Sequence, residues 1–122
     1  MIRLTAMLRR NPALDAAQFQ AHWREVHAAK ILSVPGIGDH VVRYEQHPRL
    51  PDAPGRWTGS EGFDGVTVQW FRDLDAFSAM ITDPEYRRIV GPDERELLDL
   101  AGSAYLLTDE PRVVLDSYGP AS

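Results

Sequence analysis

The chain of 122 residues has no cysteine and a single lysine, Lys30, among its 13 basic side chains. Without thiols it can form no disulfide, no thiolate metal site and no cysteine nucleophile. No apolar run approaches the roughly 20 residues that a membrane-spanning helix needs. The first residues alternate apolar and polar side chains, unlike the continuous apolar stretch of a signal peptide, which favours a cytoplasmic location.

The charge of the chain is also unlike that of a nucleic-acid-binding protein. The net charge is −5 and the basic residues are dispersed, so they form no basic patch. The content of 43% apolar and 25% charged residues is that of an ordinary globular protein. At this length we expect a single domain over residues 1–122. Arginine in place of lysine, with abundant Ala, Pro and Asp, indicates a GC-rich bacterial genome.

The first half of the chain predicts a strand, a helix and a second strand. Apolar and polar residues alternate over 2–9, the period of a half-buried strand. An amphipathic helix is expected from Asp15, or from a cap at Asn11, to about Leu32. A second strand is expected over 39–47. One face of that strand carries three candidate site residues: His40, Val42 and Tyr44.

A third strand is predicted over 66–71, and Asp73 then caps a helix that ends before Asp83 and Pro84. The remaining elements are expected as helices over 85–90 and 93–100 and a closing strand over 103–107. Residues 112–115 extend that strand or form an extra edge strand. Between the second and third strands, 48–65 is rich in Pro and Gly, and we expect a flap there that carries Trp57 over a cavity mouth.

The element order β-α-β-β-α-β predicts an α+β, ferredoxin-like fold, with helices on one face of a four-stranded antiparallel sheet. On the third strand we expect these side chains to face the helices: Val66, Val68 and Trp70. The opposite face is then half apolar and includes Met7, Val41 and Phe71. Such a face can be solvated or can meet the sheet of a second subunit.

Phe19, Trp23 and His27 recur every four residues and form one ridge along the predicted helix. An imidazole at the edge of an apolar wall is suited to proton transfer near neutral pH. The spacing leaves open the alternative of a hydrogen-bonded core histidine. His22 lies roughly 140° from His27 on an ideal α-helix, so we expect no shared metal ion, and we expect no cofactor.

These residues resemble the EthD-like family of the dimeric α+β barrel superfamily. The resemblance lies in the Phe19, Trp23 and His27 ridge, a strand ending in Tyr44, and Asp93 after a second helical segment. It implies a homodimer in which two sheets pack face to face. It also implies cofactor-free dehydratase, decarboxylase or cyclase chemistry on polyketide or aromatic intermediates. Neighbouring families include cofactor-free monooxygenases, haem-degrading enzymes and lactone isomerases.

The candidate catalytic residue is His27, as a base toward a C–H next to a carbonyl or toward a phenol, with Tyr44 or His40 donating to the developing oxyanion. The residues expected to line or close the pocket are Phe19, Trp23, Lys30, Val42, Trp57, Trp70 and Asp93. Each has a structural alternative, such as core packing for the aromatics. The leading hypothesis is a lyase, cyclase or isomerase; a cofactor-free monooxygenase and a non-enzymatic accessory protein remain alternatives.

Overall fold

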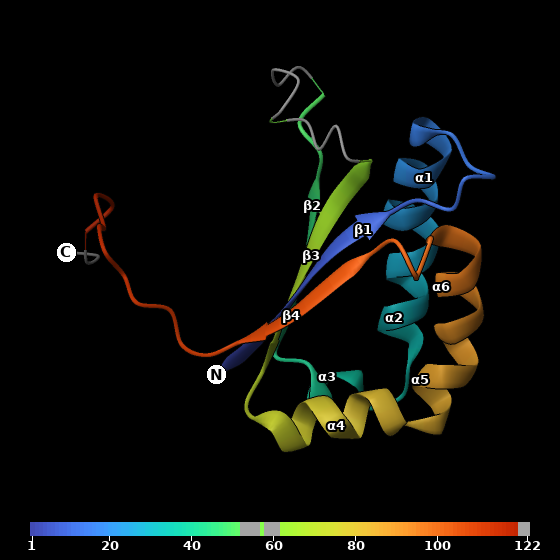
Figure 1. Cartoon of the computed structure of the whole chain (residues 1–122). Helices are drawn as coiled ribbons and strands as arrows, with labels where there is room; N and C mark the ends of the chain where they lie inside the picture. The colour runs from blue at the N-terminus through green and yellow to red at the C-terminus, as the bar shows by residue number, and fades with distance from the viewer. Residues whose placement is uncertain (52–56, 58–61, 120–122) are drawn as a thin grey trace.

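The computed structural model of the chain describes residues 1–51, 57 and 62–119. Its elements follow the predicted order (Figure 1). The strands are β1 (Ile2–Arg9), β2 (Arg43–Pro48), β3 (Phe63–Phe71) and β4 (Ala104–Thr108). The helices are α1 (Ala16–His22), the π-helix η1 (Trp23–His27), α2 (Ala28–Ser33), α3 (Ile37–His40), α4 (Leu74–Thr82), α5 (Pro84–Ile89) and α6 (Gly91–Leu97).

The strands form one antiparallel sheet in the order β2-β3-β1-β4. The helices cover one face of this sheet (Figure 1). This arrangement confirms the predicted α+β, ferredoxin-like fold. Within the described part of the chain, no helix has the length and apolar character needed to cross a membrane.

The first helical segment runs without interruption through α1, η1 and α2. A capping box begins it: the Asp15 carboxylate accepts from the Gln18 backbone N–H at 2.7 Å, and the Gln18 side chain accepts from the Asp15 N–H at 2.9 Å. In η1 the Ala28 N–H donates to the Trp23 carbonyl, an i to i+5 bond that defines a π turn. The apolar period predicted the length of the segment but not its π turn.

The predicted starts of two helices after β3 are confirmed. The Asp73 carboxylate accepts from the Ala76 N–H at 2.8 Å and begins α4. Pro84 occupies the first turn of α5, where its missing N–H costs no hydrogen bond. The last helix begins at Gly91, two residues before the predicted Asp93.

The predicted start of the second strand at Asp39 is wrong. Gly36 adopts a φ of 73°, a left-handed conformation that suits glycine, and redirects the chain after α2. Residues 37–40 then form the helical turn α3, closed by a 2.9 Å bond from the Val41 N–H to the Ile37 carbonyl. His40 therefore lies on a helix, and β2 begins at Arg43.

The predicted orientation of the third strand is also wrong. Leu4 on β1 lies opposite Gln69, so both side chains point to the helix face. Phe71, expected on the outer face, is 0% exposed and packs edge-on against Phe77 of α4, with ring centroids 5.3 Å apart. The residues on the outer face of β3 are Val66, Val68 and Trp70. Apolar side chains occur on both faces of β3, so alternation alone left its orientation undecided.

The optional edge strand over 112–115 does not form. The chain leaves β4 as an extended segment away from the sheet, and Val113, Val114 and Leu115 on it are 70%, 97% and 83% exposed (Figure 1). The predicted flap falls largely on residues 52–56 and 58–61, which lie outside the described residues.

Two apolar clusters join the helices to the sheet. One consists of Ala6, Leu8, Phe19, Trp23, Leu97 and Leu98. The other consists of Ile31, Val34 and Val90, with Ile37, Tyr44, Tyr86 and Ile89 packed against it. Trp23 reaches the sheet at Gly65, where an added Cβ would lie 2.6 Å from the indole Cη2 atom. The absence of a side chain at Gly65 therefore allows the indole to pack directly on β3.

We expect Gly65→Ala to lower the free energy of unfolding by about 1–3 kcal/mol, because the new methyl group overpacks a buried ring. Urea denaturation is the measurement. Gly38→Ala is the matched control, since a Cβ there meets nothing within 4 Å and alanine favours helix. An equal effect of both substitutions would contradict this account of the Trp23 contact.

Candidate functional site

His27 of η1 and Asp93 of α6 form a buried pair. The His27 Nδ1 atom lies 2.7 Å from Asp93 Oδ2, and the two residues are 6% and 1% exposed. A carboxylate only accepts, so Nδ1 carries the proton of this hydrogen bond. The other ring nitrogen, Nε2, is then unprotonated and keeps its lone pair.

His22 binds the same carboxylate, contrary to the helical-wheel expectation. Its Nε2 atom lies 2.7 Å from Asp93 Oδ1. On an ideal α-helix, residues five apart point in different directions, whereas a π turn bonds residues i and i+5 and brings them to one side. The π-helix over Trp23–His27 thus allows His22 and His27 to meet one acidic group.

Lys30 adds a third contact to Asp93. Its Nζ atom lies 3.5 Å from Oδ1, and its side chain is 41% exposed. Lys30 and Asp93 are both predicted to lie in the substrate pocket. In the structure the two residues contact each other, and neither belongs to the cavity lining.

The protonation of the pair follows from its environment. Burial lowers the pKa of His27, and the Asp93 carboxylate only partly opposes this effect. Burial alone would raise the pKa of Asp93, but the hydrogen bonds from His22 and His27 outweigh it and hold the pKa below its usual range. The favoured state is a neutral imidazole beside a carboxylate, which is the arrangement of an oriented base.

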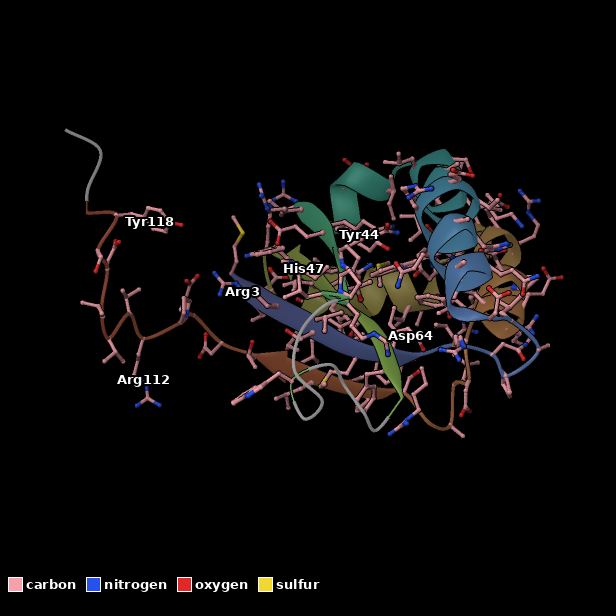
Figure 2. All side chains as sticks on the ribbon, turned by 90° about the horizontal axis from the view of Figure 1, so that it is seen from above. Arg3, Tyr44, His47, Asp64, Arg112 and Tyr118 are labelled. Carbon is pink, nitrogen blue, oxygen red and sulfur yellow. The ribbon has the colours of Figure 1, made fainter. Side chains whose placement is uncertain are left out.

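His27 lines a cavity of about 580 Å³ between the sheet and the helices. This volume lies within the range of small-molecule sites. Its apolar walls come from both layers and consist of Leu4, Ala6, Ile31, Phe77, Met80, Ile81 and Leu98. Tyr44 also lines the cavity, and Figure 2 shows it on the helix side of the sheet.

Several polar groups point into this largely apolar cavity. The Tyr44 hydroxyl accepts from the Gln46 side chain at 3.1 Å, so its own proton is free to be donated. Burial raises the pKa of Tyr44 and keeps the hydroxyl protonated. The Tyr86 hydroxyl donates to Glu94 Oε1 at 3.2 Å, and burial raises the pKa of Glu94. The other polar side chains of the lining include Thr67, Gln69 and Tyr105.

Phe19 and Trp23 belong to the core rather than to the cavity. They are 0% and 1% exposed, with ring centroids 5.3 Å apart, and neither lines the cavity. The Trp23 Nε1 atom is a buried donor without a hydrogen-bond partner among the described residues. These aromatics support the helix that carries His27.

Four predicted site residues lie elsewhere. His40 on α3 pairs with Asp83 at 3.2 Å and is absent from the cavity lining, because residues 37–40 are helical. Val42 and Trp70 border a separate hollow with Arg3 and Arg43, since they lie toward the outer face of the sheet. Trp57 is 70% exposed and does not line the cavity in the described part of the chain.

Sequence reasoning missed His22, Tyr86, Gln69 and Glu94 as members of this region. His22 was set aside by the ideal α-helical angle, and Gln69 by the wrong orientation of β3. The only indication of Glu94 in the sequence is that it directly follows Asp93. Tyr86 had no signal of its own, because its place depends on packing against the buried cluster of Ile31, Val34 and Val90.

Comparison with known proteins identifies one family. The profile of the EthD domain matches residues 11–101. No curated protein matches the sequence.

Solved structures share the fold at low sequence identity. An ethyl tert-butyl ether D family protein from Bacillus halodurans C-125 has a TM-score of 0.66 and 18% identity, over 91% of this chain and 99% of that one. A dimeric ferredoxin-like protein from Bacteroides fragilis NCTC 9343 has a TM-score of 0.65 and 14% identity, over 89% and 95%. SnoaB, a cofactor-independent oxygenase from Streptomyces nogalater, has a TM-score of 0.61 and 16% identity, over 94% and 97%.

The lowered pKa of His27 leads to a prediction about stability. The folded protein binds a proton at His27 less readily than the unfolded chain, whose imidazole titrates near about 6.5. The free energy of unfolding should therefore fall as the pH decreases below about 6.5 toward the lower pKa of the folded state, by at most about 1.4 kcal/mol per pH unit for this group. His27→Gln should remove this part of the slope in urea denaturation series. Equal slopes in the two proteins would contradict the prediction.

Proposed function

The chain belongs to the EthD domain family, and we propose that it is a cofactor-independent enzyme whose general acid–base group is His27. The substrate class is a small aromatic or polyketide-like carbonyl compound. The observation that carries the proposal is the buried His27–Asp93 pair at 2.7 Å, with His27 also in the wall of the cavity. A histidine oriented by a buried carboxylate is a recurring arrangement for proton transfer.

In the proposed reaction, Nε2 of His27 removes a proton from a carbon next to a carbonyl group or from a phenol. The imidazolium that forms is stabilised by Asp93, which also fixes the orientation of the ring. Negative charge develops on the substrate oxygen, and the free proton of the Tyr44 hydroxyl can be donated to it. The same base, now protonated, returns the proton to the product.

An enolate formed in this way can lose water, lose carbon dioxide or close a ring. The cavity of about 580 Å³ accommodates a compound of drug-like size, and its mixture of aliphatic, Phe and Tyr side chains suits a flat apolar body. These features support a lyase, cyclase or isomerase. Which of these three reactions takes place depends on the structure of the substrate.

The structural likeness to SnoaB favours a second candidate, a cofactor-free oxygenase. The same base would form a substrate carbanion that reacts with dioxygen. Consumption of dioxygen during turnover separates this reaction from the first, and an oxygen electrode measures it. Ligand binding without any turnover would instead support an accessory protein.

We expect His27→Ala to lower turnover by about 10²-fold or more, the scale of losing a general acid or base. A panel of hydroxylated aromatic ketones and acids, followed by mass spectrometry, supplies the substrate for this measurement. Asp93→Asn should also lower turnover, because an amide in place of the carboxylate no longer stabilises the imidazolium.

Thermal unfolding of the same variants is the control. If His27 only fills and hydrogen-bonds the core, His27→Ala loses about 1–3 kcal/mol of stability while turnover per folded molecule stays near normal. That outcome would refute the proposed catalytic role.

We also propose that the active form is a homodimer joined through the outer face of the sheet. Met7 on β1 is 41% exposed, and Leu106 on β4, on the same face opposite Thr5, is 64% exposed. The related Bacteroides fragilis structure is described as dimeric. Because Phe71 is buried on the helix side, it is no longer included in the expected interface.

The dimer should bury more than about 1,000 Å² of total surface, as stable interfaces do. Light scattering at micromolar concentration should give twice the chain mass for the wild type and a shift to monomer for Leu106→Glu. Leu32→Glu is the matched control, because Leu32 on α2 is 76% exposed but lies on the helix side. A monomeric wild type would contradict the proposal.

A further inference from the structure

Two arginines at the mouth of the cavity have unpaired guanidinium groups. Arg87 on α5 and Arg95 on α6 are exposed and line the cavity. Arg87 uses Nε to donate to the Ile81 carbonyl at 2.8 Å, which leaves its terminal nitrogens free. Neither guanidinium forms a salt bridge with an acidic group in the part of the chain that the structure describes.

Some other arginines of the chain form ion pairs with carboxylates and do not face the cavity. Arg10 binds Asp64 at 2.7 Å, Arg43 binds Glu45 at 2.6 Å, and Arg88 binds Glu85 at 2.6 Å. The chain has 18 acidic and 13 basic side chains, so acidic partners are plentiful. Unpaired guanidinium groups beside a cavity leave positive charge directed at whatever occupies it.

A glycine between the two arginines leaves room for a ligand group. Positions 87, 91 and 95 follow each other at intervals of four along α5 and α6. A Cβ at Gly91 would meet only Arg95 Nη1, at 3.8 Å, and Gly91 itself lines the cavity. The space over Gly91 is therefore open to a ligand, with the Arg95 guanidinium beside it and Arg87 in the same cavity wall.

Among the described residues that line the cavity, Glu94 is the single acidic one. One of its oxygens already accepts from the Tyr86 hydroxyl at 3.2 Å. It forms no ion pair with Arg95, although the positive charge of Arg95 acts on it. The two arginines together thus outnumber the acidic charge of the lining.

We propose that Arg87 and Arg95 form a subsite for a carboxylate carried by the substrate. A guanidinium offers a planar pair of donors that matches the two carboxylate oxygens. This inference rests on the proposed function and narrows its substrate class to aromatic or polyketide-like carbonyl compounds that bear a carboxylate. The carboxylate sits over Gly91, and the apolar body lies against the cavity wall near His27.

The test compares two probes of nearly equal shape, 2-naphthoate and the uncharged 2-naphthamide, by calorimetric titration at low ionic strength. The wild type should bind the carboxylate at least about tenfold more tightly than the amide, and added salt should reduce this preference. Arg87→Gln and Arg95→Gln should each remove most of the preference and leave the affinity for the amide unchanged. That unchanged affinity also shows that the variants are folded.

Arg88→Gln is the matched control, because Arg88 is the neighbour of Arg87 on α5 but pairs with Glu85 and does not line the cavity. It should keep the wild-type preference. Equal affinity for the two probes, binding of neither, or a preference that survives both Arg→Gln substitutions would overturn the proposal. The titration repeated in His27→Gln should keep the preference, so a failure of the proposed catalysis is distinguishable from a failure of this subsite.

Discussion

Asp93 holds a carboxylate at a position where the residue is only 1% exposed, and a charge there is tolerated only with close partners. His22 and His27 supply these partners at 2.7 Å each. The three side chains tie the first helical segment to α6 across most of the chain length. Removing one partner of such a group leaves a buried charge uncompensated, so the carboxylate constrains both helices.

The contact of both histidines with Asp93 requires the π turn of η1. This turn gives up the regular α-helical ladder over Trp23–His27 and in return aligns two histidines that an α-helix would separate. Phe19 and Trp23 are buried against the sheet, and their packing holds this part of the helix in place. Packing and hydrogen bonding thus cooperate: the aromatics fix the height of the helix above the sheet, and the carboxylate fixes the imidazole.

The cavity gathers its chemistry from segments that are distant in sequence. His27 comes from the first helical segment, Tyr44 from β2, and Arg87 and Glu94 from α5 and α6. Each of these elements has its own structural support, such as the cap of α5 by Asp83. The proposed base, hydroxyl donor and carboxylate subsite surround one apolar space, and together they fit the proposed proton transfer on a carboxylated aromatic carbonyl compound. The outer face of the sheet remains available to a second subunit.

The sequence by itself determined the element order, the alternation of β1, the cap at Asp73 and the burial of the Phe19, Trp23 and His27 ridge, because these follow from periods and local hydrogen bonds. The family resemblance rested on the same ridge. Only the tertiary structure decided the orientation of β3, since apolar residues on both of its faces make alternation ambiguous until Leu4 is paired with Gln69. The π turn and the contact of Asp93 with both histidines likewise depend on long-range packing, which local patterns do not encode.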